Sequence, residues 1–574
     1  MRYRKNMRKA HRIALLAAAI FLCAAFAAVR DELFLISKNL DIFSAVYRQV
    51  SMNYVDETNS GKLVKTAVDA MLDDLDPYTE YVQDTDVEDY KLKYVDTRYG
   101  GIGAAIFAQD NRIFISEIYA GQPADHAGLQ AGDELVAVNG SPLARLTPDE
   151  ASRLLRGADG SAINLEVRHV LLDRLDTVTL TRAMIRQPNV SHISLLEGGV
   201  GYIKLDKFLE QSASEIENAV NNLQRQGSLN GLIIDLRDNG GGILQEAVKI
   251  VNLFVPPGEL VVSQRGRNSV KNRSYRTMAT PIAPDIPLAV LINGHSASAA
   301  EIVAGALQDL DRAVIIGERS FGKGLVQQTF NIPYNNLVKV TVAKYYTPAG
   351  RCIQALDFHK GRNGKYAHVP DSSIHAFQTK GGRIVYDGSG IYPDITVEKR
   401  ANSAIVSTLL AQRLIFDYAT LFKSAHPHIA AADKFMVSDT QYADFIRFLA
   451  DRNYHYLSDA EKQLRELRVQ AGAAGKPEAV LQRFDALAQA LRGDSAPVID
   501  RYRNEIKEAL GAEMVSRYYY QEGKKAFSMQ HDDQLKRAVG LLDLGKAAYY
   551  SILSGEGDYK TIGKPETVLA VTPQ

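Results

Sequence analysis

Apolar positions recur with two different periods along the chain, and the changes of period divide it into segments. In residues 30–95 apolar side chains return at helical spacing, which predicts a mainly helical region. Between 96 and 184 short runs alternate apolar and polar positions, which is typical of half-buried strands. One helix is expected inside that segment, over 147–156, because Pro148 suits a first helical position.

Residues 185–398 alternate apolar runs with amphipathic helical runs. Strands are expected at 200–205, 232–236, 287–292 and 313–316, and helices at 214–226, 243–254 and 298–310. This βαβ rhythm predicts an α/β core. Residues 399–574 are rich in Ala, Leu, Arg and Glu and are expected to be helical, serving packing or partner contact rather than chemistry.

Composition and charge narrow the classes of function. The 574 residues allow three or four domains with a large core. Lys plus Arg and Asp plus Glu both number 67, so the zero formal net charge gives no general attraction to nucleic acid, and we set that role aside. Of the two cysteines, Cys352 alone lies outside the N-terminal apolar run, so the predicted mature chain has no internal disulfide.

The N-terminus has the pattern of an export signal. Residues 1–12 carry six basic side chains and no acid, and residues 13–29 form an apolar run without charge. A small-x-small cleavage site lies at 25–27. We therefore expect an exported protein of the periplasm or cell envelope. An uncleaved inner-membrane anchor is the alternative, and the sequence leaves open whether the chain forms a homo-oligomer.

A serine and a lysine in Gly/Ala-rich surroundings are the first candidates for chemistry. Ser298 is followed by Ala-Ala-Glu301, a capping-box pattern, so it either caps a helix or acts as a nucleophile where the helix dipole favours negative charge. Lys323 lies between Gly322 and Gly324 and is either a solvated turn residue or a general base, since a buried amine loses its proton more easily. No histidine has the placing of a standard triad, and no zinc motif is present.

Two further features flank this pair. Gln327 is four residues after Lys323; in a strand the two would share a face, and a neutral amide can hold an amine without charging it. The loop 238–242, Asp-Asn-Gly-Gly-Gly, either supplies a backbone amide to an oxyanion or is a plain turn. Residues 317–323 nearly match a phosphate-binding loop, but Gly324 replaces the Ser or Thr and a strand follows, which disfavours nucleotide hydrolysis.

These residues resemble the carboxyl-terminal processing (tail-specific) proteases of the Ser-Lys kind. The matching stretches are Gly201-Tyr-Ile-Lys-Leu205, 233–239, Ser296-Ala-Ser-Ala-Ala-Glu301, Phe321-Gly-Lys-Gly-Leu-Val-Gln327 and Tyr345-Tyr-Thr-Pro-Ala-Gly350. The resemblance implies Ser298 as nucleophile, Lys323 as general base and Gln327 as the residue that orients it. It also implies oxyanion-hole amides at Gly241 and Ala299.

Three other positions bear on this resemblance. Asp309 matches an acid of the family, and we expect a structural role for it. Ala300 stands where the family usually has Ser, and Gly240 where it usually has Pro. Neither change removes a reacting group, so activity is expected to survive both.

The segment before the α/β core resembles a PDZ domain. Its signals are Gly121-Gln-Pro-Ala-Asp-His-Ala-Gly-Leu129 and then Gly132-Asp with Val138-Asn-Gly140. The resemblance implies that a peptide C-terminus adds as a strand and that Gly101, Ile102 and Gly103 bind its carboxylate. Leu154 and Leu155 are expected as walls of the pocket for the last side chain.

The fold expected is therefore an α/β protease core with an inserted β-rich PDZ domain, plus helical N-terminal and C-terminal regions. The expected boundaries are 1–29, 30–95, 96–184, 185–398 and 399–574. The function expected is an exported serine endopeptidase that captures protein or peptide substrates by apolar C-termini and needs no cofactor or metal. The alternative is a non-catalytic scaffold on the same fold that binds peptides or apolar ligands.

Overall fold

The computed structural model describes most of the chain after the predicted export signal. The described residues are 34–95, 98–169, 174–358, 367–450, 452, 456, 459–491 and 499–563. The signal predicted over 1–29 lies outside them. The chain forms two compact units, the first ending at Tyr81 and the second beginning at Val82.

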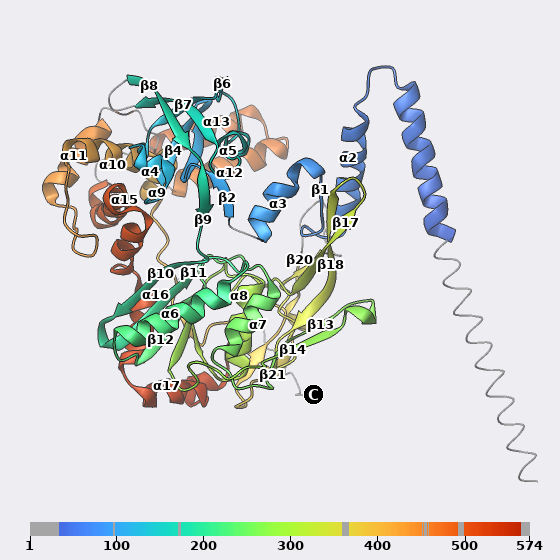
Figure 1. The fold of residues 1–574 in the computed structure, drawn as a ribbon, viewed down its shortest axis with the longest axis vertical. Helices are drawn as coiled ribbons and strands as arrows, with labels where there is room; N and C mark the ends of the chain where they lie inside the picture. Colours follow the sequence, from blue (N-terminus) through green and yellow to red (C-terminus); the bar gives the residue numbers. More distant parts are fainter. Residues whose placement is uncertain are drawn as a thin grey trace, which may run out of the picture. The chain divides into compact units, whose positions relative to one another are not determined.

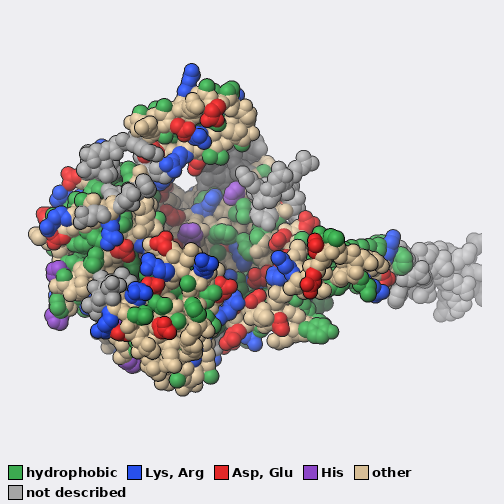
Figure 2. Space-filling view, turned by 90° about the horizontal axis from the view of Figure 1, so that it is seen from above, with side chains coloured by type: hydrophobic (Ala, Val, Ile, Leu, Met, Phe, Trp, Pro, Cys, Tyr) green, Lys and Arg blue, Asp and Glu red, His purple; other side chains and the backbone are tan. Residues whose placement is uncertain are grey.

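The first unit is helical, as expected for this region. A helix over residues 34–53 turns back into α2 (Ser60–Asp73), whose N-terminus is capped by the Asn59 side chain. Many large apolar side chains of this unit are exposed; they are Phe34, Leu35, Ile36, Leu40, Ile42, Phe43, Val46, Val50, Met52, Tyr54, Val55, Met71 and Leu75. Figure 2 shows hydrophobic side chains along these helices.

In the larger unit, the β-rich module follows α3 (Val87–Tyr94). Its sheet has the order β3 (Ala104–Gln109), β4 (Arg112–Ile118), β5 (Glu134–Val138), β7 (Ala162–His169) and β8 (Arg174–Thr181), with β6 (Ser141–Pro142) beside β5. The helix expected at 147–156 is confirmed as α5 (Pro148–Leu155), closed by a complete capping box between Thr147 and Glu150. Among the described residues β3 is the last strand on one side of the sheet, so its outer edge can pair with a further strand.

The α/β core is a six-stranded sheet (Figure 1). Its order is β10 (Val190–Leu196), β11 (Val200–Leu205), β12 (Gly231–Asp235), β15 (Leu288–Ile292), β16 (Val314–Gly317) and β23 (Ile395–Thr396). All neighbours are parallel except β10 and β11. The strands expected from the βαβ rhythm are confirmed, whereas β10 and β23 were not foreseen.

Helices cover both faces of this sheet. One face packs against α6 (Ser212–Gln226), α7 (Leu244–Asn252) and α8 (Ala299–Asp309), all three expected from the sequence. The other face packs against α16 (Asp533–Asp543) and α17 (Lys546–Leu553), which come from the C-terminal region. Helices α16 and α17 therefore complete the core of a sheet whose first strand begins at Val190.

A second sheet stands beside the core. Strand β18 (Asn336–Tyr346) pairs antiparallel with both β17 (Leu325–Ile332) and β13 (Leu260–Arg265), and β13 pairs with β14 (Arg273–Arg276). Small pairs of strands follow in β19 (Leu356–Asp357) with β20 (Ala367–His368) and in β21 (Ala376–Gln378) with β22 (Ile384–Tyr386).

The rest of the C-terminal region is helical, as predicted. It contains α9 (Ala404–Ala411), α10 (Leu414–Ala425), α11 (Asp439–Ala450), α12 (Asp459–Ala473), α13 (Glu478–Leu491) and α15 (Arg503–Met529), and four of these, α9, α10, α11 and α15, share a buried apolar core. Within the described residues no single helix is long and apolar enough to cross a membrane. The pair α9 and α10, bent by 64°, meets those criteria only when its two helices are taken together.

Candidate active site

Ser298 lies at the turn between β15 and α8, in a backbone conformation that serine rarely adopts. Its φ is +56° and its ψ is −111°, while Ala299 begins the helix. Positive φ is unfavourable for a residue with a Cβ and persists only where surrounding contacts hold it. The side chain is half-buried, so the turn presents a partly accessible hydroxyl at the N-terminus of a buried helix.

Glu301 holds the Ser298 turn and the Lys323 segment together. One carboxylate oxygen, Oε2, accepts the backbone N–H of Ser298 at 2.9 Å and that of Lys323 at 2.8 Å. The other, Oε1, accepts the Gly322 amide at 2.6 Å and the Ser320 hydroxyl. Because one oxygen holds both amides, the backbones of Ser298 and Lys323 lie side by side.

The Glu301 side chain is fully buried, and its burial has an electrostatic consequence. Desolvation raises the pKa of this carboxyl above its ordinary value, while the hydrogen bonds from Ser320, Lys323 and Gly322 act in the opposite direction. The carboxylate accepts hydrogen bonds from four donors at once. This explains how an isolated acid is tolerated in the core beside the site.

Tyr345 of β18 holds the Ser298 turn from another side. Its hydroxyl donates to the Ser298 carbonyl at 3.2 Å, and the same carbonyl accepts the Ile302 amide at 2.9 Å. The ring is buried. Both ends of the Ser298 residue are therefore fixed by hydrogen bonds to groups outside the turn.

Lys323 is half-buried on a tightly packed stretch of backbone. Gly322 has φ +86°, and a Cβ there would lie 2.4 Å from the Ala355 side chain; at Gly324 a Cβ would lie 2.8 Å from the Gln354 amide nitrogen. The glycines on both sides of the lysine are thus required for the segment to pack. Glu318, an acid five residues before the lysine, accepts the backbone amide of Lys399 at 2.8 Å.

Gln327 lies in β17 and faces β18 across the ladder. Its Nε2 donates to the Thr341 hydroxyl at 3.2 Å. The argument from strand periodicity does not hold, because β17 begins only at Leu325 and the register shifts between Val326 and Gln327. Gln327 is thus a neutral amide whose nitrogen is held by β18, four residues after Lys323 in the sequence.

The glycine loop predicted at 238–242 packs directly on the Ser298 turn. A Cβ at Gly241 would lie 2.6 Å from the Ala297 carbonyl and 2.8 Å from the Ala299 nitrogen, so only glycine fits. Asn239 ties the two segments, since its carbonyl accepts the Ala297 amide at 2.9 Å. Its side-chain Oδ1 accepts the Gly241 amide at 2.9 Å, so in this conformation that N–H points at Asn239.

In the β-rich module, Gly101, Ile102 and Gly103 form the turn from β2 (Arg98–Gly101) into the open edge strand β3. Gly103 has φ +75°, and a Cβ there would lie 2.2 Å from Gln122 Cβ. The expectation that Leu154 and Leu155 both form walls of the peptide pocket is wrong for Leu155. Leu155 is buried in the core of the module, and only Leu154, 39% exposed, is accessible to a ligand.

Asp309 lies at the other end of α8 and has structural partners. Its carboxylate accepts Arg351 Nη2 at 2.6 Å and the Ala349 amide at 2.9 Å, and both charged side chains are buried. These contacts agree with the structural role expected. The sequence did not predict three contacts of this site. They are the bridge that Glu301 makes between the Ser298 and Lys323 segments, the hydrogen bond from the Tyr345 hydroxyl to Ser298, and the hydrogen bond that the Asn239 side chain accepts from Gly241. Only Glu301 gave a signal, through its capping-box spacing.

Comparison with known proteins gives three matching family models. Peptidase family S41 matches residues 199–359, a PDZ domain matches 114–169, and a model described as a probable PDZ-protease C-terminal helical domain matches 405–542. The three matches follow one another along the chain in the order in which the structure builds its β-rich, α/β and helical parts.

Individual proteins similar to this chain are named carboxy-terminal processing proteases. The chain is 34% identical over 322 residues to a carboxy-terminal-processing protease of Bartonella bacilliformis, covering 56% of this chain and 73% of that protein. It is 31% identical to carboxy-terminal processing protease CtpA of Bacillus subtilis over 54% of this chain and 66% of that protein. The solved photosystem II D1 C-terminal processing protease is 27% identical, with 62% and 92% of the chains covered and a TM-score of 0.33.

Proposed function

Because the chain belongs to the carboxy-terminal-processing proteases of peptidase family S41, with a PDZ domain, we propose that it is an exported serine endopeptidase. It recognises protein C-termini through the PDZ domain and cleaves upstream with Ser298 and Lys323. The observation that carries this proposal is the pairing of the Ser298 and Lys323 amides on one Glu301 oxygen.

Catalysis begins with proton transfer between the two side chains. The neutral amine of Lys323 accepts the proton of the Ser298 hydroxyl as Oγ attacks the scissile carbonyl carbon. The Gln327 amide oxygen accepts a hydrogen bond from the amine and orients it. The tetrahedral intermediate then expels the amine product, which takes the proton from Lys323, and water hydrolyses the acyl-enzyme by the same route.

The oxyanion formed in each half-reaction needs two backbone N–H donors. Ala299 supplies one backbone amide at the N-terminus of α8, where the helix dipole also favours negative charge. Gly241 supplies the second once its N–H turns away from Asn239 Oδ1. Its φ of +93° belongs to a glycine whose backbone rotates at low cost.

Substrate capture uses the open edge of β3. An extended peptide adds beside β3, its terminal carboxylate meets the amides of Gly101, Ile102 and Gly103, and its last side chain contacts Leu154. Main-chain hydrogen bonds then give affinity for any tail, while the apolar contact favours apolar last residues.

The test uses the purified chain and a protein substrate with an apolar C-terminus. Ser298→Ala and Lys323→Ala are expected to abolish cleavage while tail binding stays unchanged. The control is His295→Ala, because His295 is exposed near the serine and would be needed only by a Ser-His enzyme. Cleavage that survives in either of the first two variants would refute the assignment.

The second candidate is a non-catalytic scaffold on the same fold. What favours it is the hydrogen bond between Gly241 and Asn239, which occupies one oxyanion donor. A fluorophosphonate that labels Ser298 in the wild type, and not in Ser298→Ala, would rule it out. Tail binding without labelling or cleavage would establish it.

Export and self-association complete the proposal. The basic run 1–12 and apolar run 13–29 support export to the periplasm or cell envelope, and N-terminal sequencing of the chain recovered from cell fractions would distinguish a cleaved signal from an anchor. The exposed apolar side chains of residues 34–75 support a homo-oligomer, because such surface is seldom left to water. A monomeric mass in light scattering would contradict it.

A further inference from the structure

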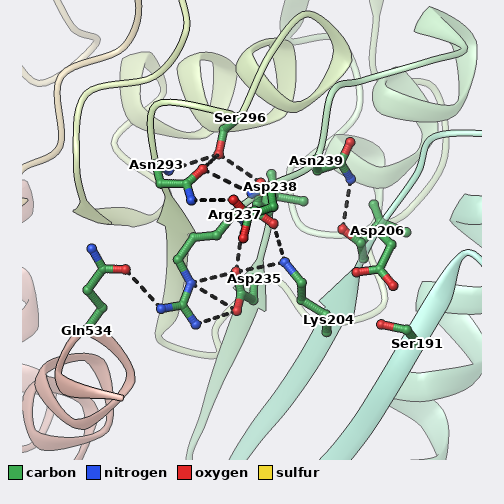
Figure 3. Close-up of polar contacts among 12 residues, drawn as sticks. Ser191, Lys204, Asp206, Asp235, Arg237, Asp238, Asn239, Asn293, Ser296 and Gln534 are labelled. Atoms are coloured by element: carbon green, nitrogen blue, oxygen red, sulfur yellow. Dashed lines mark hydrogen bonds and ion pairs between the residues drawn. The ribbon is translucent and has the colours of Figure 1, made fainter. Parts of the chain in front are cut away.

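Arg237 directly precedes the glycine loop, and carboxylates hold its guanidinium from two sides. Asp235 accepts Nε at 3.0 Å and Nη2 at 2.6 Å. Asp532 accepts Nη1 at 2.9 Å and Nη2 at 2.6 Å, and Gln534 Oε1 also accepts Nη1 at 2.9 Å. Figure 3 shows Arg237 reaching from the core toward Asp235 and Gln534. A planar guanidinium gripped along two edges has a fixed orientation.

The C-terminal partners are themselves anchored. Asp532 is the N-cap of α16, and its Oδ1 also accepts the Leu535 amide at 3.0 Å. Gln534 Nε2 donates to the Val397 carbonyl at 2.7 Å. Since α16 packs on the apolar face of the core sheet, both acceptors are presented to Arg237 from a rigid support.

The two residues after Arg237 are joined by hydrogen bonds to the Ser298 turn and to the strand end before it. Asp238 donates its amide to Asn293 Oδ1 at 3.0 Å and accepts from Asn293 Nδ2 at 2.9 Å. The carbonyl of Asn239 accepts the amide of Ala297 at 2.9 Å. A shift of Arg237 would therefore move the loop that lies against the serine and carries Gly241.

We propose that Asp532, assisted by Gln534, is a positioning residue for the active site: the C-terminal helical region holds Arg237 and thereby places the loop 238–242 against Ser298. This inference rests on the proposed function. It gives residues 399–574 a part in the reaction that the sequence did not indicate, since the acceptors are separated from Arg237 by almost three hundred positions.

Asp532→Ser is the informative variant. Serine is a good N-cap, so α16 is retained, but it is uncharged and too short to grip the guanidinium along an edge. With the full chain and a cleavable tail-bearing substrate, we expect kcat to fall on the order of tenfold while KM and tail binding change little. The rate of fluorophosphonate labelling at Ser298 should fall in parallel.

Further variants separate positioning from folding. Asp533→Ser is the matched control, because the Asp533 side chain is 71% exposed and pairs with Lys536 at 3.8 Å, and it should keep wild-type kcat. Gln534→Ala leaves the N-cap untouched and should give a smaller fall in kcat than Asp532→Ser. In an Arg237→Lys background, Asp532→Ser should cause no additional loss, since it acts through the arginine.

The outcomes distinguish this inference from the proposed function. An active wild type with unchanged kcat in Asp532→Ser overturns the inference alone. A loss of activity that merely follows a loss of folded protein, measured by circular dichroism, also overturns it. A wild type that neither cleaves nor is labelled overturns the proposed function, and this inference with it.

Discussion

The hydroxyl of Tyr345 donates a 3.2 Å hydrogen bond to the backbone carbonyl of Ser298, so the second sheet holds the turn that carries the proposed nucleophile. Burial, and after it the charge of Glu301, raises the pKa of Tyr345 well above its ordinary value. The hydroxyl therefore keeps its proton, and remains a donor, across the pH range in which a lysine base would become neutral.

Tyr345→Phe removes this donor and almost nothing else. We expect a loss of about 1 kcal/mol in the free energy of unfolding, and a several-fold fall in kcat because the strained turn is held less firmly. Tyr346→Phe is the control, since adjacent residues of a strand point to opposite faces. Equal effects of the two substitutions on kcat would contradict the role given to Tyr345.

Glu301→Gln tests the bridge between the Ser298 and Lys323 segments. An amide nitrogen replaces one carboxylate oxygen and turns a donor toward donors, so one or two buried N–H groups lose their acceptor at about 1–3 kcal/mol each. We expect lower stability together with a fall in kcat on the order of a hundredfold, because both proposed reacting groups move. Glu318→Gln, at a carboxylate that accepts the Lys399 amide, should keep most activity.

Sequence patterns predicted the elements well because each of them carries its own signal. Pro148 indicated the start of α5, and the apolar run of β12 indicated a buried strand. The placing of Ser298 and Lys323 near each other came from resemblance rather than from periodicity. The register shift next to Gln327 shows why periodicity alone was insufficient, since it breaks the alternation assumed there.

The contacts that join distant segments had no local signal. Tyr345 and Asp532 are ordinary residues of a strand and a helix start, and their partners are fixed only when the sheets and helices pack. The burial of Leu155 was missed for the same reason. On α5 two neighbouring leucines look equivalent, and only the position of the sheet decides which one faces the core.

Gly103→Ala tests tail capture by the PDZ domain. The substitution forces a Cβ onto a residue with φ +75° and places it 2.2 Å from Gln122 Cβ, so the turn proposed to bind the carboxylate must shift. We expect the variant to bind a peptide with a free apolar C-terminus at least about tenfold more weakly than the wild type does, as measured by fluorescence polarisation. The amidated peptide should bind weakly to wild type and variant alike.

Gly140→Ala is the matched control for backbone strain. Gly140 has φ +78°, nearly the same as Gly103, but a Cβ there meets nothing within 4 Å. Both variants carry the left-handed cost of about 1–2 kcal/mol. Only Gly103→Ala should weaken tail binding, and a parallel loss in Gly140→Ala would assign the effect to general destabilisation of the domain.

Asp235→Asn should alter how stability depends on pH. Burial opposes ionisation of Asp235, but Lys204 and Arg237 outweigh it and hold the pKa of this carboxyl well below its ordinary value. A lowered folded-state pKa contributes stability that is present above the unfolded pKa of about 3.9 and is lost as the pH falls below it. Removing one partner of a buried ion pair costs about 3–5 kcal/mol.

Melting temperatures measured between pH 7 and pH 3 should therefore be much lower for Asp235→Asn than for the wild type at neutral pH, and this difference should narrow below about pH 4. The exposed Asp533→Asn should follow the wild type throughout, and a deficit in Asp235→Asn that stays constant across this range would show that the carboxylate is not held ionised by its neighbours.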